Sequence, residues 1–108
     1  MDERLPALAE QLLLIERELR RLGWWSATAP DVEALASQQP FCVDTLSFEA
    51  WLQWILLPRM KMLIETAAPL PAASAIREMG EEVYGASGKQ VGVLLDLLGG
   101  FDRLIAAG

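Results

Sequence analysis

Apolar residues recur every three or four positions along most of this chain, and this spacing constrains the fold more than any other feature. The first repeat consists of Leu5, Leu8, Leu12, Ile15, Leu19 and Leu22. Residues at this spacing line one face of an α-helix, so the pattern predicts a helix over residues 3–22. Gly23 follows as its stop signal. The alternating pattern of a β-strand does not occur, and we expect an all-α fold.

A second helix is predicted from Ser47, its N-cap, to about Glu65. It is apolar on two sides, and such a helix is usually internal. One side carries Phe48, Trp51, Leu52, Ile55, Met62 and Leu63, and the other carries Trp54, Leu57 and Ile64. Pro58 lies within this helix and predicts a kink, because proline lacks an N–H and its ring clashes with the preceding turn.

Shorter elements are expected on either side of this central helix. A short helix is predicted over residues 31–37, and extended chain over residues 40–46. A further helix is predicted over residues 71–84. Its inward-facing residues are Ile76, Met79 and Val83.

The last helix is predicted over residues 88–106, after a turn in which Ser87 and Gln90 form a capping box. Its core stripe is Val91, Leu94, Leu95, Leu98, Phe101 and Ile105. A second apolar stripe consists of Val93, Leu97 and Leu104. Together the segments predict a single domain, residues 1–108, folded as a compact bundle of about four helices.

Composition narrows the classes of function. The chain has 108 residues, a net charge of −6 and no histidine. Nucleic-acid binding relies on clustered Lys and Arg, so direct binding by this chain alone is not expected. The single cysteine cannot form an internal disulfide, and no apolar run approaches the roughly 18 residues of a membrane span. No signal peptide is visible, and we expect a cytoplasmic protein that does not enter a membrane.

Residues suited to catalysis are sparse. Glu81 and Glu82 lie on a solvated face, whereas acid–base roles require burial. Cys42 has no histidine to activate it and is expected to fill apolar space. No residues have metal-ligand spacing, phosphate-binding glycine motifs are absent, and segment 85–89 is interpreted as a turn. We therefore expect no enzyme activity, no cofactor and no metal.

Two charged residues fall within predicted apolar faces. Arg59 projects near Leu52 and Leu63 on the central helix, and Asp102 lies within the core stripe of the last helix. A charge in such a place must be paired or must reach the surface. Arg59 would form an ion pair with Asp44 or Asp102, extend its guanidinium to solvent, or anchor a partner's carboxylate or phosphate.

Four tryptophans in one short chain indicate either a large aromatic core or an interface. Core packing is the ordinary interpretation, above all for Trp51. Trp24 and Trp25 are adjacent, so one of them is expected at the surface, where aromatic residues are favoured as interface anchors. The candidate partner-binding residues are Trp24, Trp25, Trp54, Leu57, Arg59, Val93, Leu97 and Leu104.

The stretch PFCVDTLSFEAWLQWILLPRM, which begins at Pro40, resembles the signature of the YqcC-like family of small proteobacterial proteins. The similarity also covers the leading helix, the PLP turn and the helix that follows it. It implies a helical bundle of this size and no catalytic motif. Members are often encoded beside a tRNA pseudouridine synthase, which implies an accessory role in tRNA modification. The matching residues, whose role could be wholly structural, are Pro40, Phe41, Cys42, Asp44, Leu46, Phe48, Trp51, Leu52, Gln53, Trp54, Pro58, Arg59 and Met60.

Three functional hypotheses follow. The leading one is a non-enzymatic module that binds a protein partner, namely the pseudouridine synthase, through apolar helix faces and exposed tryptophan. The second is a pocket beside the kinked helix that binds a small anionic or aromatic ligand and reaches Arg59. The third is a homodimer in which the same apolar stripes meet and the role is purely structural.

Overall fold

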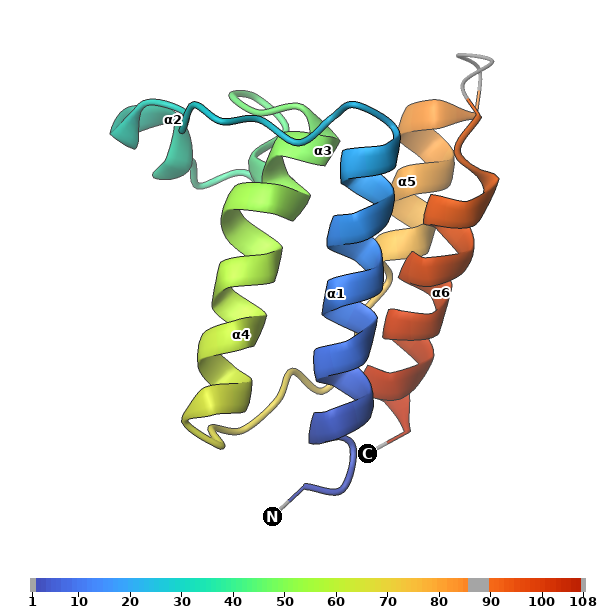
Figure 1. The fold of residues 1–108 in the computed structure, drawn as a ribbon. Helices are drawn as coiled ribbons and strands as arrows, with labels where there is room; N and C mark the ends of the chain where they lie inside the picture. Colours follow the sequence, from blue (N-terminus) through green and yellow to red (C-terminus); the bar gives the residue numbers. More distant parts are fainter. Residues whose placement is uncertain (1, 86–89, 108) are drawn as a thin grey trace.

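The computed structural model describes residues 2–85 and 90–107, and most of them are helical (Figure 1). The elements are α1 (Leu5–Arg21), α2 (Val32–Leu35), the 3-10 turn η1 (Pro40–Cys42), α3 (Phe48–Trp51), the π-helical segment η2 (Leu52–Leu56), α4 (Leu57–Glu65), α5 (Ile76–Tyr84) and α6 (Gly92–Ala106). Within the described ranges there is no β-strand. The predicted all-α bundle is confirmed.

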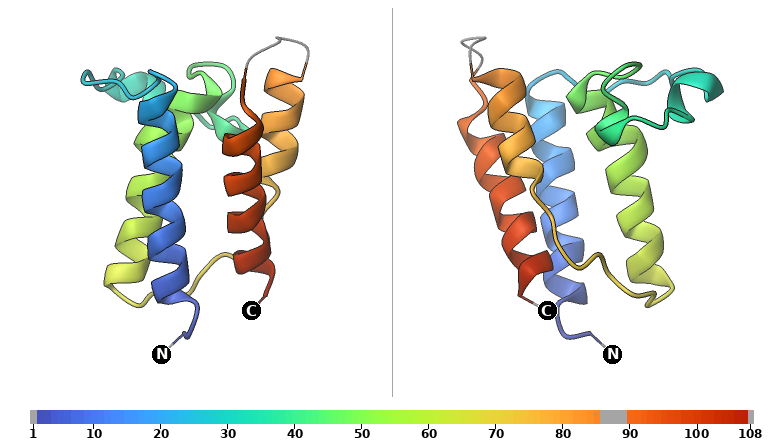
Figure 2. Two further views of the ribbon diagram at one scale, coloured as in Figure 1. Left: turned by 45° about the vertical axis from the view of Figure 1, so that its right-hand side comes forward. Right: turned by 180° about the vertical axis from the view of Figure 1, so that it is seen from behind.

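The helix α1 is the middle element of the bundle. It packs against α4 on one side and α6 on the other, and α5 packs against α6 (Figures 1 and 2). The chain after α4 crosses behind the bundle to reach α5, as the rear view in Figure 2 shows. The core is built from one stripe of each long helix, including Leu8 and Ile15 of α1, Leu52 of η2, and Leu94 and Leu98 of α6.

The end of α1 follows the sequence prediction. Gly23 has a φ of 78°, a left-handed conformation that costs glycine little. The N–H of Gly23 donates to the carbonyl of Arg20 at 3.0 Å, and the N–H of Trp24 donates to that of Leu19 at 2.9 Å. This pair of bonds is a Schellman motif, which satisfies carbonyls at the end of the helix.

The irregularity predicted at Pro58 is present as the π-helical segment η2 immediately before it. The N–H of Leu57 donates to the carbonyl of Leu52, five residues earlier. A wider turn at this point accommodates Pro58, whose ring would crowd the carbonyl four residues earlier in a regular α-helix.

The extra residue in η2 also changes which residues of the central helix face the core. Phe48 and Leu52 before it, and Leu57 and Met60 after it, are all buried. The prediction had placed Leu57 on the opposite side and Met62 on the core side, and both placements are wrong. A single inserted residue rotates the following residues by about 100°, which a regular helical period cannot anticipate.

Two other predicted segments need correction. Residues 40–46 are not extended, because Pro40–Cys42 forms the turn η1 and the N–H groups of Thr45 and Leu46 both donate to the carbonyl of Cys42. Phe41 and Cys42 have φ values of 56° and 51°, which are rare for residues other than glycine.

The helix predicted over residues 71–84 begins five residues later, at Ile76. Its start is fixed by Asp102 of α6, whose carboxylate accepts hydrogen bonds from the backbone N–H groups of Ile76 at 3.0 Å and Arg77 at 2.9 Å. Ile76 and Met79 face the core as predicted, whereas Val83 is exposed. The inner stripe is instead Ile76, Gly80 and Tyr84, because Gly80 lets α5 approach Leu95 and Phe48 closely.

The core stripe predicted for the last helix is confirmed. Val91, Leu94, Leu98, Phe101 and Ile105 are buried, and Leu95 packs against them. The helix itself begins at Gly92, later than predicted. The predicted capping box at Ser87 and the turn over 85–88 fall mainly on residues 86–89, which lie outside the described residues.

Candidate interaction surface

A groove lined by two tryptophans lies between the central helix, formed here by η2 and α4, and the loop that follows α1. Its volume is about 420 Å³. We call it the tryptophan groove, and its lining residues are Trp25, Ser26, Ala27, Gln53, Trp54, Leu57, Pro58 and Lys61. Five of these eight were candidate or signature residues in the sequence, so the fold brings together positions 25, 53, 54, 57 and 58.

Gln53 fixes the shape of the tryptophan groove. It belongs to η2 and its side chain is buried. Its Oε1 accepts a hydrogen bond from the N–H of Ser26 at 2.9 Å, and its Nε2 donates to the carbonyl of Ser26 at 2.7 Å. The loop after α1 is thereby attached to the central helix at a π-helical turn, a kind of turn that is frequent at functional sites.

The adjacent tryptophans have different neighbours, and both are half-buried. Trp24 stacks on Tyr84, with ring centroids 5.3 Å apart. Trp25 lines the groove, and the guanidinium of Arg20 lies 4.5 Å from its ring centroid. Trp54 on the opposite wall is half-buried. Trp25 and Trp54 therefore present partly exposed aromatic surface to the groove, whereas Trp24, also half-buried, does not line it.

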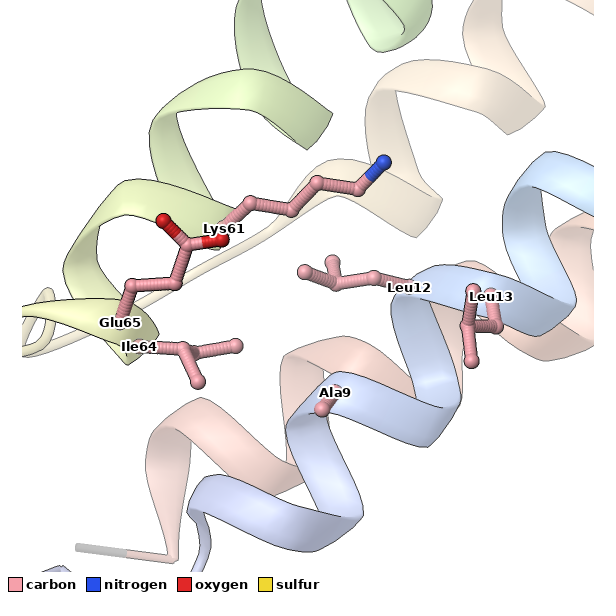
Figure 3. Close-up of a pocket in the computed structure, with 6 residues that line it drawn as sticks. All are labelled: Ala9, Leu12, Leu13, Lys61, Ile64 and Glu65. Carbon is pink, nitrogen blue, oxygen red and sulfur yellow. The ribbon is translucent and has the colours of Figure 1, made fainter.

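A second cavity, of about 230 Å³, lies between α1 and α4 (Figure 3). Ala9, Leu12 and Leu13 of α1 face Ile64 and Glu65 of α4 across it. Lys61 lines both cavities, and its Nζ lies 3.4 Å from the Glu16 carboxylate. The sequence analysis missed Leu13 and Lys61. The signal for Leu13 was present, because this leucine lies outside the core stripe of α1.

The second stripe of α6 lies in a different place. Val93 is 54% exposed, whereas Leu97 and Leu104 are half-buried against the core. Val93 and Leu97 line a cavity of about 200 Å³ with residues of α1. The carboxylate of Glu18 forms the buried wall of this cavity, and hydrogen bonds from Arg21 lower the pKa of Glu18 in spite of its burial. The structure does not bring this stripe to the tryptophan groove.

The structure places two of the predicted partner-binding residues differently from the sequence prediction. Leu57 is only 1% exposed, so its predicted position on an uncovered helix face is wrong. Arg59 is exposed instead of projecting into the apolar face. Among the described residues Arg59 forms no ion pair, and its expected partners are engaged elsewhere, Asp44 with Ser37 and Asp102 with the start of α5. The cavity that Arg59 lines has a volume of about 260 Å³.

The remaining signature residues build the turn before α3. Phe41 packs edge-on against Trp51, with ring centroids 4.8 Å apart, and Phe48 stacks on Trp51 at 6.1 Å. Cys42 is a buried free thiol, and Pro40 begins η1. Tyr84 of α5 completes the cluster and donates a hydrogen bond to the Glu49 carboxylate at 2.5 Å. These residues hold the left-handed turn at Phe41 and Cys42 in place.

Neither a cluster of metal-ligating side chains nor a membrane-spanning helix is found among the described residues. In residues 2–85 and 90–107, no group of three or more His, Cys, Asp or Glu side chains is placed to hold a metal ion. Over the same part of the chain, the helices are too short or too polar to span a bilayer.

Comparison with known proteins identifies the family. A family model described as DUF446, tRNA pseudouridine synthase C, matches residues 7–104, which extend from the first turn of α1 to the last turn of α6. The chain belongs to this family. YqcC of Escherichia coli K12 is 35% identical over 96 residues, which are 89% of this chain and 88% of YqcC. The resemblance inferred from the signature is confirmed.

Other relatives extend the comparison. The solution NMR structure of E. coli YqcC matches 97% of this chain and 90% of that chain, with a TM-score of 0.86 and 32% identity. An uncharacterised protein of Haemophilus influenzae is 38% identical over 73 residues, which are 68% of this chain and 69% of that protein. A Pectobacterium carotovorum protein named tRNA pseudouridine synthase C is 44% identical over 62 residues, which are 57% of this chain and 16% of that protein.

Proposed function

We propose that this DUF446 protein is a non-enzymatic interaction module that assists a tRNA pseudouridine synthase. One observation carries the proposal. In Pectobacterium carotovorum, a segment 44% identical to 62 residues of this chain makes up 16% of a protein named tRNA pseudouridine synthase C. Most of that protein lies outside the match, so the DUF446 segment and the rest of the named synthase are parts of one polypeptide.

A covalent link of this kind has a direct physical meaning. Joining two modules in one chain keeps them at an effective concentration in the millimolar range, so that even a weak contact is occupied. A separate chain such as this one needs an interface of its own to reach the same occupancy. Specific interfaces bury apolar and aromatic anchors at their centre.

The tryptophan groove is the surface that best supplies such anchors. It offers two indole rings with partly exposed faces, and its floor is held rigid by the two hydrogen bonds between Gln53 and Ser26. Rigid aromatic groups lose little conformational entropy when a partner covers them, so they contribute more to affinity than flexible groups of equal area.

The test uses purified full-length chain and a tRNA pseudouridine synthase C encoded as a separate polypeptide. We expect a complex by calorimetry or light scattering, and a higher rate or extent of tRNA pseudouridylation when both proteins are present. Unchanged modification together with no complex would reject the proposal. A self-associated chain that ignores the synthase would favour the homodimer instead.

A variant pair locates the contact. Trp54→Ala removes one wall of the tryptophan groove and should weaken the complex by about 30-fold, the effect of losing an interface hot spot. Met62→Ala removes an exposed apolar side chain from α4 outside the groove and should change affinity less than about threefold. Equal effects of the two substitutions would move the interface away from the groove.

A further inference from the structure

A second apolar groove lies on another side of the molecule, between the turn at residues 41–47 and α5. Its volume is about 220 Å³. The lining residues are Phe41, Val43, Leu46, Ser47, Phe48, Met79 and Val83. Its two valines are exposed, Val43 by 53% and Val83 by 41%. We call this the acidic groove because of the charges that surround it.

Carboxylates border the acidic groove on the side of α5. Glu78 and Glu82 immediately precede the lining residues Met79 and Val83, so they form a parallel stripe rotated by about 100° around the helix. The opposite neighbouring stripe, which includes Gly80 and Tyr84, faces the core. Glu78 and Glu82 are therefore on the outer rim, where both are exposed and neither is paired with a cation among the described residues.

The other side of the acidic groove carries the same sign of charge. Asp44 follows the lining residue Val43 and is exposed, and its carboxylate accepts a hydrogen bond from Ser37. Glu49 follows Phe48, but its carboxylate is engaged by the hydroxyl of Tyr84. The sequence contains no Lys or Arg between Arg21 and Arg59. The one cation of α5, Arg77, is paired with Glu81 and Asp96. An anionic partner would be repelled here, while a cationic one would gain from Glu78, Glu82 and Asp44.

The turn that forms one wall of the groove is held in an uncommon conformation. Phe41 and Cys42 adopt consecutive left-handed φ values, and contacts of the Phe41 ring with Trp51 and Phe48 hold them there. Such a conformation costs free energy and persists where the surroundings determine it. Val43, the next residue, is exposed and lines the acidic groove together with Phe41.

We propose that the acidic groove binds a basic segment of the partner protein, one that inserts one or two apolar side chains and flanks them with Lys or Arg. The inference rests on the proposed function. An enzyme that binds tRNA needs a cationic surface to meet the phosphates, and this chain, with a net charge of −6, complements such a surface. The apolar centre provides affinity, and the carboxylate rim provides orientation and association rate.

The first experiment tests the groove without the synthase. Two amphipathic peptides share the same apolar residues, and carry lysines in one and glutamates in the other. Titration of the full-length chain, followed by NMR, should show the lysine peptide shifting signals of Val43, Met79 and Val83, with little effect from the glutamate peptide. No binding, or shifts centred on the tryptophan groove or spread over the surface, would overturn the inference.

The second experiment uses the synthase and two charge-reversal variants. Glu78→Lys combined with Glu82→Lys should weaken the complex by about tenfold or more at low salt and reduce its salt dependence. Glu3→Lys combined with Glu10→Lys makes the same charge change at two exposed positions, one just before α1 and one within it, and should have an effect below about twofold. Circular dichroism melting confirms that each variant is folded.

An apolar pair complements the charge pair. Val83→Ser acts within the acidic groove, whereas Val32→Ser changes an exposed helical valine of α2 outside it. Only Val83→Ser should weaken synthase binding. If the synthase binds wild-type chain and all four variants alike, the groove inference fails while the proposed function stands. If the synthase does not bind wild-type chain, the proposed function fails, and the peptide titration alone decides the inference.

Discussion

Gln53 and Ser26 are joined by a pair of hydrogen bonds, in which the side-chain amide of Gln53 meets both the N–H and the carbonyl of Ser26. This contact links a π-helical turn to a loop 27 residues earlier in the chain. Trp25 precedes Ser26 and Trp54 follows Gln53, so the contact holds the two tryptophan-bearing segments together, and both rings line the tryptophan groove. The amide of Gln53 suits this role because it supplies a donor and an acceptor at once.

Replacing Gln53 should loosen this loop. Gln53→Leu keeps the volume of the side chain but leaves both backbone groups of Ser26 without their partner, at a cost of about 1–2 kcal/mol in unfolding free energy. Urea denaturation would measure the loss. Gln39→Leu, at an exposed position, is the matched control and should change stability by less than about 0.5 kcal/mol. A Gln53→Leu variant as stable as wild type would show that water replaces the amide fully.

The C-terminal ends of α1 and α4 share one motif, and substitutions there should change stability in opposite directions. Gly23 and Ala67 both occupy the left-handed position of a Schellman motif, with φ values of 78° and 51°. After α4 the N–H of Ala68 donates to the carbonyl of Leu63 at 3.0 Å. We expect Gly23→Ala to destabilise the protein and Ala67→Gly to stabilise it, each by about 1 kcal/mol, because left-handed strain outweighs the entropy of glycine in the unfolded chain. Thermal melting would check both signs, and a shift in the same direction would contradict the shared motif.

Asp102 should be needed for the start of α5. Asp102→Ala removes the acceptor for the N–H groups of Ile76 and Arg77 and should cost about 2 kcal/mol, since charged caps at helix N-termini are among the stronger ones. Asp96→Ala removes an exposed carboxylate that pairs with Arg77 and should cost less than about 0.5 kcal/mol. Hydrogen exchange of the first amides of α5 would show whether the loss is local to this helix end.

Tyr84 should resist ionisation in the folded protein. Burial of the phenol, and then its hydrogen bond to Glu49, raise the pKa of Tyr84 well above its usual value near 10. The pKa of Tyr84 is higher in the folded than in the unfolded chain, so the neutral phenol stabilises the fold. This stabilisation is fully present below pH 10 and is lost as the pH rises above it. The chain has one tyrosine, so ultraviolet titration reports it alone. We expect no tyrosinate until the protein unfolds at alkaline pH.

The Glu49 contribution to this shift can be separated from burial. Glu49→Gln removes the negative charge beside the phenol, and the pKa of Tyr84 should fall while remaining above its usual value, because burial is the larger cause. Glu78→Gln, on the exposed side of α5, should leave the titration unchanged. A normal tyrosine titration in the folded wild-type protein would contradict the packing of Tyr84 against Glu49.

Arg59 should contribute little to stability. It is exposed, and it makes no ion pair with any residue in the described ranges. Arg59→Met should therefore change the unfolding free energy by less than about 0.5 kcal/mol. A large loss of unfolding free energy would instead support the structural ion pair that the sequence had suggested. If the variant is as stable as wild type, the Arg59 guanidinium of the wild-type protein is available to a ligand or partner. Binding measurements that compare the variant with wild type would examine this role.

Local patterns in the sequence were enough to predict those features of the helices that arise from neighbouring residues alone. The stripe of α1, the stop at Gly23, the cap at Ser47 and the core stripe of α6 all follow from spacing and from short-range hydrogen bonds. These features need no contact with distant parts of the chain, because helical period and capping act within a few residues.

Only the tertiary structure decided the features that depend on contacts between distant segments. The π-helical turn before Pro58 rotated Leu57 into the core and Met62 out of it, and Asp102 set the beginning of α5 from another helix. The tryptophan groove exists because Gln53 holds the loop at Ser26. Sequence by itself determined which segments form the long helices and which of their faces are apolar. Packing determined which of those faces stay open to a partner, since burial depends on what lies opposite each side chain.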